Sequence, residues 1–264
     1  MPVETDRAAI RARLLADRAW SVYALGDLAP GMFEHTTWHV AAHAQSHGAL
    51  LMVFSGLEIP VLFAIGSADS VEALLDELGG QRRLYLLVKP EILPLIRARY
   101  RVSHETAMWR LVLDPARFAR PASRAVRLSI ADYPALLRLH ADGASTGEAP
   151  DFFGPYMVEQ GVFYGLYEGA ELVASAGTHI VAPSEGVAVV GNVYTRRDRR
   201  GRGYARQVTG AVTDELLKHM PAGTLLALNV IQANAPALAV YRRLGYVTYC
   251  GFFEGLAERP GAGG

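Results

Sequence analysis

The sequence predicts an α/β (α+β) protein of two domains, each with a mixed, mostly antiparallel sheet flanked by helices. Three observations support this prediction. Apolar residues recur alternately at strand and at helix spacing along most of the chain. The pattern breaks once, between Asp114 and Arg124, where prolines and arginines show no sustained period. The composition, with 51% hydrophobic and 20% charged residues, is that of a globular protein.

The first half of the chain contains the weaker functional signals. Apolar residues recur at helical spacing from Ile10 to Leu28, and strands and short helices follow as far as Leu113. Strands are predicted at 48–55, 60–65, 83–88 and 107–113, and helices at 71–78 and 91–100. The break after residue 114 then sets the predicted domains at 1–118 and 119–258.

The second half mixes hairpins with crossover helices, which predicts a mixed sheet. Strands are predicted at 125–128, 162–167, 172–180, 187–194, 225–230 and 247–252. Helices are predicted at 131–140, 204–220 and 236–244. The tail at 259–264 is rich in Gly and is predicted to be disordered.

Charge and cysteine content exclude several classes of protein. Lys plus Arg and Asp plus Glu both number 26, so no long-range field attracts nucleic acid or an anionic membrane. Cys250 is the only cysteine, which excludes an internal disulfide and a multi-cysteine metal site. Residues 1–13 lack the apolar core of a signal peptide, and no run of about 18 apolar residues could span a bilayer. We therefore expect a cytoplasmic protein.

Four histidines recur every four residues, a spacing that would form a ladder on a helix. They are His35, His39, His43 and His47. The residues around them favour strand or turn, where the spacing would not converge on one ion, and no carboxylate or cysteine completes the set. We expect no metal site.

The strongest motif lies between the strand at 187–194 and the helix at 204–220. Six of the twelve residues from Thr195 to Arg206 are arginine, and glycines occupy positions 201 and 203. Glycine lets an anion approach the main chain, and the helix start supplies unpaired N–H groups and a positive dipole end. No Lys-Ser or Lys-Thr follows the glycines, and Arg206 stands where a dinucleotide fingerprint needs Gly. The segment therefore predicts a pyrophosphate loop that is neither a Walker loop nor an NAD site.

Arg200-x-x-Gly203-x-Ala205 resembles the Q/R-x-x-G-x-G/A signature of the GNAT superfamily of N-acetyltransferases. The resemblance covers about half the chain and implies a GNAT-like second domain that uses acetyl-CoA. It implies that the loop and the strand before it bind the cofactor, through Asn192, Val193, Tyr194, Thr195, Arg200, Gly201, Arg202, Gly203, Tyr204, Ala205 and Arg206. It also implies that this strand splays from its neighbour and that the main chain near Val193 binds the acyl carbonyl.

A second segment resembles the family's N-x-x-A-x-x-x-Y-x-x-x-G-F/Y pattern. Asn234, Ala237, Tyr241, Gly245 and Tyr246 fall on its positions, after Asn229 in the preceding strand. Asn234 also suits a helix N-cap, and Tyr241 lies on or beside the apolar face, where a purely structural tyrosine is the alternative. The resemblance implies that Asn229, Asn234 and Ala237 line the cofactor arm and that the Tyr241 hydroxyl lies near the thioester sulfur.

These residues predict direct attack of a neutral amine on the acetyl thioester. The N–H of Val193 or a neighbour would stabilise the oxyanion, and Tyr241 would protonate the thiolate. No basic partner activates Cys250, so no acyl-enzyme is expected. Candidates for the base are Glu148, Asp151, Glu159 and His179, and the sequence singles out none of them.

Residues 1–118 show neither a phosphate loop nor a counterpart of Tyr241, yet their strand and helix order resembles a degenerate copy of the second domain. Two other functions remain open: a noncatalytic CoA-binding regulatory or scaffold protein, and nucleic-acid binding through the loop arginines. The intact Asn234 and Tyr241 favour the enzyme, and the zero net charge argues against nucleic acid. The acceptor, a small-molecule or peptide amine, is not identified, and a homodimer remains open.

Overall fold

The computed structural model describes residues 3–43, 46–144, 146–148, 150 and 153–260, and it divides into two compact units. The first unit contains 1–110, 231–233 and 249–264, and the second contains 111–230 and 234–248. The predicted domain limits at 118 and 258 remain a prediction, and the limits of the units differ from them. The units divide inside two strands, because β5 (Arg101–Leu113) and β11 (Tyr246–Glu258) each have residues in both units.

The sheet of the first unit has the order β1-β2-β3-β4-β11-β5. Its strands, apart from β11, are β1 (Thr36–His43), β2 (Ser46–Phe54), β3 (Val61–Ile65), β4 (Arg83–Val88) and β5 (Arg101–Leu113). Its helices are α1 (Arg7–Leu14), α2 (Val22–Gly26), α3 (Ala68–Leu75) and α4 (Leu93–Arg97). Strands β3 and β4 are parallel because α3 crosses between them, and their other neighbours are antiparallel.

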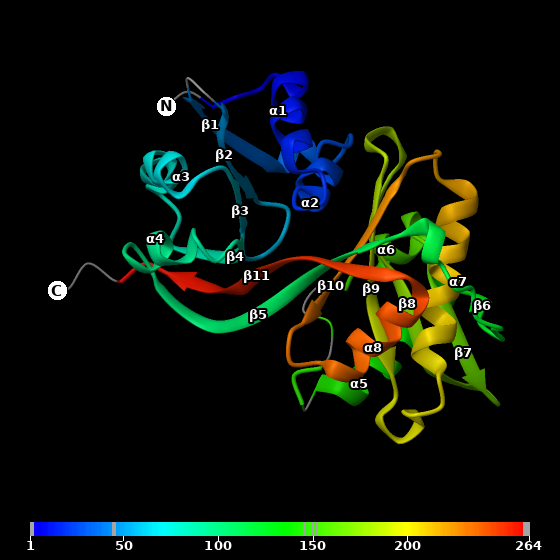
Figure 1. Cartoon of the computed structure of the whole chain (residues 1–264). Helices are drawn as coiled ribbons and strands as arrows, with labels where there is room; N and C mark the ends of the chain where they lie inside the picture. Colours follow the sequence, from blue (N-terminus) through cyan, green and yellow to red (C-terminus); the bar gives the residue numbers. More distant parts are fainter. Residues whose placement is uncertain (1–2, 44–45, 145, 149, 151–152, 261–264) are drawn as a thin grey trace. The chain divides into compact units, whose positions relative to one another are not determined.

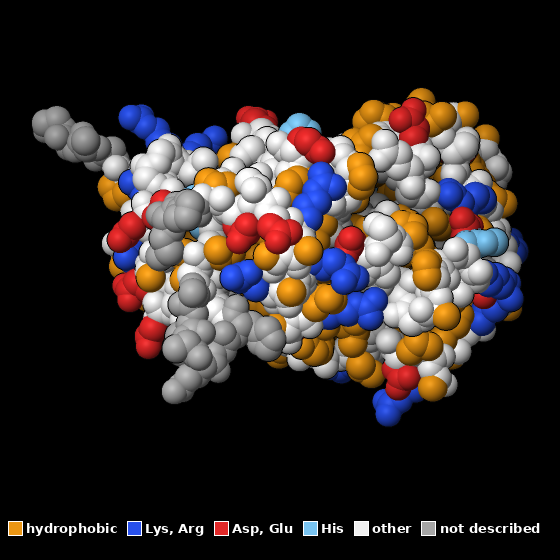
Figure 2. Space-filling view, turned by 90° about the horizontal axis from the view of Figure 1, so that it is seen from above, with side chains coloured by type: hydrophobic (Ala, Val, Ile, Leu, Met, Phe, Trp, Pro, Cys, Tyr) orange, Lys and Arg blue, Asp and Glu red, His pale blue; other side chains and the backbone are white. Residues whose placement is uncertain are grey.

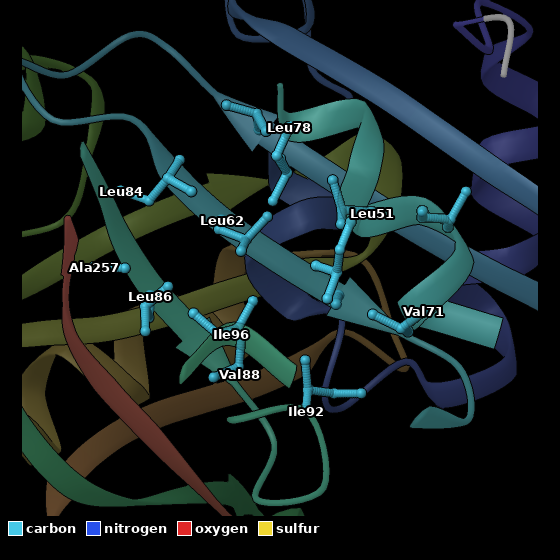
Figure 3. Packing of buried hydrophobic residues seen from close by; sticks show 14 of the residues in the cluster. Leu51, Leu62, Val71, Leu78, Leu84, Leu86, Val88, Ile92, Ile96 and Ala257 are labelled. Carbon is cyan, nitrogen blue, oxygen red and sulfur yellow. The ribbon is translucent and has the colours of Figure 1, made fainter. Parts of the chain in front are cut away.

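The core of the first unit lies between this sheet and its helices. Leu62 from β3, Leu86 from β4, Val71 of α3 and Ile96 of α4 belong to one buried cluster, and Figure 3 shows Leu86 close to Ile96 and to Ala257 of β11. All five are buried, with at most 1% of their surface exposed. Burial of such side chains stabilises the fold by roughly 1.5–3 kcal/mol each for the larger ones.

The sheet of the second unit has the order β10-β9-β8-β7-β6. These strands are β6 (Val126–Arg127), β7 (Tyr164–Glu168), β8 (Glu171–Ala182), β9 (Val187–Thr195) and β10 (Leu225–Ile231). The helices are α5 (Tyr133–Ala144), α6 (Pro155–Gln160), α7 (Tyr204–His219) and α8 (Ala235–Leu244). Helix α7 contacts β7, β8 and β9, and crosses from β9 to the parallel strand β10 (Figure 1).

The two units repeat one order of elements. A hairpin (β1–β2, β7–β8) is followed by an antiparallel strand (β3, β9), a crossover helix (α3, α7), a parallel strand (β4, β10) and a short helix (α4, α8). This order confirms the predicted fold class and the degenerate copy in the first half. Strand β11 follows α8 of the second unit in sequence, yet its residues 253–258 pair with β4 of the first unit.

Most predicted elements are confirmed within a few residues, three differ in their bounds, and two elements of the structure were not predicted. The helical spacing from Ile10 to Leu28 forms two helices, α1 and α2, with a break between them. Strand β5 begins at Arg101 rather than 107, and β11 continues to Glu258 rather than 252. Strand β1 and helix α6 were not predicted, because the residues of β1 favoured strand or turn without a defined range and α6 lies in a segment without a sustained period.

The four spaced histidines do not form a helical ladder. His35 ends a 3-10 turn, His39 and His43 lie in β1, and His47 lies in β2. The side chains of His43 and His47 fall outside the described residues. Most of the predicted disordered tail also falls outside them, although the Arg259 backbone N–H donates to the Arg82 carbonyl at 2.9 Å.

The surface carries mixed charge, in keeping with the equal numbers of acidic and basic residues. On the face shown in Figure 2, basic and acidic side chains lie interspersed with apolar ones. Within the part of the chain that the structure describes, none of the helices is long and apolar enough to cross a membrane.

Candidate functional site

The second unit opens between its two parallel strands. Strands β9 and β10 are paired from Val187 with Leu225 to Val190 with Leu228. Among the described residues their register ends there, although β9 continues for five residues to Thr195. The backbone groups that β9 turns toward β10 beyond Val190 therefore lack a strand partner. This is the splay that the resemblance implied, and it occurs at the predicted residues Asn192–Thr195.

Two β-bulges shape this opening. One lies in β9, where Asn192 has a φ of 50°, and the other lies in β8 at His179. The His179 ring lies over Gly191, since a Cβ on that glycine would stand 2.2 Å from the imidazole Nε2. A bulge re-aims the backbone groups around it and is common beside functional sites. Here the two bulges change the direction of the β9 main chain next to Val190, where its pairing with β10 ends.

The main chain that connects β9 to α7 forms the predicted loop. Gly201 and Gly203 have φ values of 79° and 75°, which L-residues with a side chain rarely adopt. A Cβ placed on either glycine meets nothing within 4 Å among the described residues, so the space in front of this main chain is open. Gly203 is the N-cap of α7 without a side-chain cap, and the first helical bond runs from the Gln207 N–H to the Gly203 carbonyl. The N–H groups of residues 204–206 are therefore available to an anion.

Five of the six loop arginines form ion pairs with carboxylates. The pairs are Arg196 with Glu171 and Asp198, Arg197 with Asp142, Arg199 with Asp198 and Glu168, Arg200 with Glu148, and Arg202 with Glu168. Glu168 also accepts a short hydrogen bond from the Tyr204 hydroxyl. The loop thus carries much less free positive charge than its sequence suggests.

Asp142, at the end of α5, fastens the start of the loop. Its carboxylate accepts hydrogen bonds from the Tyr194 hydroxyl at 2.8 Å and from the Arg197 backbone N–H at 3.0 Å. These bonds hold the pKa of Asp142 below its ordinary value, the Arg197 N–H having the larger effect. The buried Tyr194 ring also lies 5.6 Å from the Arg200 guanidinium, and its pKa is raised to about 12, mainly by burial.

Helix α8 positions the second predicted group of residues. The Asn234 side-chain oxygen accepts the Ala237 backbone N–H at 3.1 Å and so caps the helix, and Gly245 ends it with a φ of 102°. Tyr241 lies on the buried face with 7% of its surface exposed, 6.3 Å from the Tyr246 ring. Burial raises the pKa of Tyr241 to about 12. Its hydroxyl therefore keeps its proton at neutral pH.

The four candidate bases occupy different surroundings. The Glu148 carboxylate accepts hydrogen bonds from Arg200 at 2.9 Å and from the Thr146 hydroxyl at 2.9 Å, and Arg200 lowers the pKa of Glu148. Asp151 lies outside the described residues. Glu159 is exposed on α6. Burial lowers the pKa of His179 to about 4, against the opposing effect of the neighbouring Asn192, so the His179 imidazole is neutral at pH 7.

The structure brings together the end of β9, the loop and the first turn of α7. Asn229 follows directly on Leu228, the last residue of β10 paired with β9. Sequence reasoning missed Asp142, Glu168 and Glu171, which hold the loop from other elements. No local signal marks them, because they lie 25–55 residues from their arginine and tyrosine partners in the sequence.

Cys250 belongs to the first unit, in β11. Burial raises the pKa of its thiol, so little thiolate is present at neutral pH. The structure thus provides no activation of this thiol as a nucleophile among the described residues.

Comparison with known proteins identifies the family of this site. The model of the acetyltransferase (GNAT) family matches residues 131–246. Among solved structures, a GNAT-family protein from Novosphingobium aromaticivorans has 21% identity and a TM-score of 0.60, with 90% of this chain and 96% of that chain covered. A GCN5-related N-acetyltransferase from Kribbella flavida has 17% identity and a TM-score of 0.60, with 93% and 95% covered.

A tandem GNAT protein from the clavulanic acid biosynthesis pathway has 16% identity and a TM-score of 0.56, with 98% of this chain and 97% of that chain covered. A comparison with curated proteins gives no significant match. At these identities the solved structures show the fold alone, and they show it for both halves of the chain. Residues 131–246 are therefore a domain of the acetyltransferase (GNAT) family, and almost the whole chain has the fold of GNAT proteins.

Proposed function

We propose that the second unit binds acetyl-CoA and transfers its acetyl group to a primary amine. One observation carries this proposal: the opening between β9 and β10 leads to a glycine loop whose following helix offers unbonded N–H groups. This geometry suits an acyltransferase. Amides at the start of a helix can bind a diphosphate, and an unpaired strand edge can bind the extended arm that carries the acyl group. The acetyl donor and the amine acceptor are the proposed parts.

The donor would be held mainly by main chain. The amides of residues 204–206 and the open approach to Gly201 and Gly203 suit the pyrophosphate. The edge of β9 from Asn192 to Thr195 suits the pantetheine arm, with Asn229 and Asn234 on the β10 and α8 side. An N–H of β9 at Val193 or a neighbour would donate to the thioester carbonyl and to the oxyanion that forms from it.

The transfer would be a single displacement. The amine nitrogen forms a bond to the acetyl carbon, the carbon–sulfur bond breaks, and the electron pair of that bond stays on sulfur. Tyr241 donates a hydrogen bond to the sulfur and then its proton, which solvent replaces. Because the pKa of Tyr241 is about 12 and a free thiol has a pKa of about 8.5, hydrogen bonding is the main part of this role. The proton of the amine leaves through water or through one of the candidate bases.

Two measurements test this function. Titration calorimetry with CoA and acetyl-CoA is expected to show one site per chain, and a panel of primary amines with a free-thiol readout is expected to include an acceptor. Binding without thiol release from any amine would instead support the alternative, a noncatalytic CoA-binding regulatory or scaffold protein. Absence of CoA binding at millimolar concentration, or salt-sensitive oligonucleotide binding in its place, would refute both.

A further inference from the structure

Asn192, in β9, has a buried side-chain amide without a hydrogen-bond partner. Only 6% of the residue is exposed. Its Oδ1 and Nδ2 are both shielded from solvent, and neither forms a hydrogen bond with any residue that the structure describes. A shielded polar group that lacks a partner is unfavourable, and native folds rarely keep a complete amide in this state without a use for it.

The backbone of Asn192 is unfavourable as well. Its φ of 50° lies in the left-handed region, where His104 is the only other described residue that is not glycine. Asn192 and Val193 together face Ala176 of β8, because Gly191 pairs with Gly177 and Tyr194 with Ser175. This is a β-bulge, and strained backbone of this kind is concentrated at functional sites. Two unfavourable features at one residue indicate a functional constraint.

Neighbouring groups show where the Asn192 amide lies. The His179 ring lies over Gly191, where a Cβ would stand 2.2 Å from the imidazole Nε2. Asn192 lies beside the same ring, since it counteracts part of the lowering of the His179 pKa. The amide is therefore on the His179 face of β9, two residues beyond Val190, where the pairing with β10 ends. The next residue is Val193, beside which the proposed function places the acyl carbonyl.

The Asn192 amide matches the groups that would react at this place. Its oxygen and nitrogen are attached to one carbon, as are the carbonyl oxygen and the entering nitrogen in the adduct of an amine with a thioester. An amine can donate an N–H to Oδ1, and a carbonyl oxygen can accept from Nδ2. The proposed function uses the main chain of Asn192 at the strand edge, so the side chain adds a separate pair of groups.

We propose that the Asn192 side chain binds both reacting groups, with Nδ2 donating to the acyl carbonyl and Oδ1 accepting from the attacking amine. This inference rests on the proposed function and adds a residue to its chemical step. The bond from Nδ2 strengthens as negative charge develops on the oxygen, and the bond to Oδ1 holds the nitrogen toward the acyl carbon. Asn192 forms no covalent bond, so the bonds made and broken remain those of the single displacement.

Asn192→Gly in the full chain tests this role, because glycine removes the amide and accepts the φ of 50°. The kcat/KM for the amine is expected to fall about 100-fold, the usual effect of losing an oxyanion donor. Calorimetry should show that acetyl-CoA binds about 3- to 10-fold more weakly, and that CoA, which lacks the carbonyl, stays within twofold. Asn192→Asp loses the N–H donors and brings a negative charge toward the oxyanion, so its kcat/KM should fall at least as far.

His104→Gly is the matched control. His104 has a φ of 52° but is exposed in β5, in the first unit, so kcat/KM and both affinities should stay unchanged. Thermal unfolding of Asn192→Gly without ligand should be unchanged or occur at a higher temperature, since no hydrogen bond of the side chain is lost. If that variant does not fold, Asn192→Asp decides.

The outcomes separate this inference from the proposed function. Equal losses of affinity for CoA and acetyl-CoA would overturn the inference in favour of a contact with the pantetheine arm. Should the natural protein transfer the acetyl group and both Asn192 variants transfer it equally well, this inference alone falls. Should the natural protein release no thiol with any amine, the proposed function falls, and this inference falls with it.

Discussion

At the scale of single residues, burial sets the protonation state of Tyr241. With a pKa raised to about 12, the hydroxyl stays protonated as pH rises through the physiological range and beyond. It can therefore act as a hydrogen-bond donor to sulfur at any pH at which the fold persists. The same burial gives it a packing role against Tyr246, which a phenylalanine would keep.

Tyr241→Phe is expected to lower kcat about 100-fold or more while the dissociation constant of CoA stays within twofold, because only the donor to the departing sulfur is lost. Steady-state kinetics and calorimetry measure the two quantities. The pH profile of the natural enzyme should show no loss of activity from this group below about pH 11. An unchanged kcat would reduce Tyr241 to a packing residue.

Gly203 combines a backbone requirement with a functional one. Gly203→Ala is expected to cost about 1 kcal/mol of folding stability, because alanine is unfavourable at a φ of 75°. It should also weaken CoA at least tenfold, because the new Cβ lies in the open space in front of the loop. Thermal unfolding and calorimetry measure these effects.

Gly223→Ala is the matched control. Gly223 has a φ of 79° and open space around its Cβ position, but it lies in the turn before β10. We expect a similar loss of stability and an unchanged affinity for CoA. Equal affinities in the two variants would show that the diphosphate does not approach Gly203.

At the scale of elements, α5 holds the glycine loop between β9 and α7 through one carboxylate. Asp142 binds Tyr194 at the end of β9 and the Arg197 N–H at the start of the loop. Since these bonds hold the pKa of Asp142 below its ordinary value, the carboxylate is charged at neutral pH, and its contribution is lost only in acid, as pH falls through that lowered pKa. The loop is thus fixed before any ligand arrives.

Asp142→Asn is expected to weaken CoA about three- to tenfold and to lower the unfolding temperature by a few degrees, because two bonds to a charged acceptor become bonds to a neutral one. Asp132→Asn is the control. Asp132, at the other end of α5, likewise accepts a tyrosine hydroxyl, that of Tyr167 at 2.8 Å, and a backbone N–H. The Asp132→Asn variant should lose stability but keep its affinity for CoA. A loss of affinity as large as that of Asp142→Asn would point to a general effect on α5.

At the scale of the whole molecule, the first unit depends on the C-terminal strand. Residues 253–258 of β11 pair with all of β4, and Ala257 lies in the core of that unit. Arg259 adds a hydrogen bond from its Nε to the Tyr100 hydroxyl at 3.1 Å. The first unit is therefore complete only after residues 253–258 have been synthesised.

A chain that ends at Thr248 is expected to lose the cooperative unfolding of the first unit. Strand β4 would have unpaired backbone groups on one side, and the core would lose the side chains of β11 that pack in it. A chain that ends at Pro260 keeps all of β11 and should unfold like the natural protein. Circular dichroism and limited proteolysis, with cleavage mapped to residues 1–110, distinguish the two chains. Full protection of the first unit in the shorter chain would show that β11 is dispensable.

Local features of this fold could be predicted from the sequence. The caps of α8 at Asn234 and Gly245 and the glycines of the loop all act between residues close in the chain. The start of β5 at Arg101 could not be predicted, because the exposed residues 101, 104 and 105 show no strand alternation. The bulges at Asn192 and His179 were also hidden, because a register shift depends on the partner strand.

The sequence by itself determined most of the elements, the fold class and the place of the glycine loop between β9 and α7, because propensity, spacing and capping depend on neighbouring residues. Only the tertiary structure decided that carboxylates occupy five of the six loop arginines, that β9 leaves β10 after Val190, and that β11 completes the first unit. These features join side chains and strands that are tens of residues or more apart. Such pairings form only when the whole chain packs, and a local pattern carries no record of them.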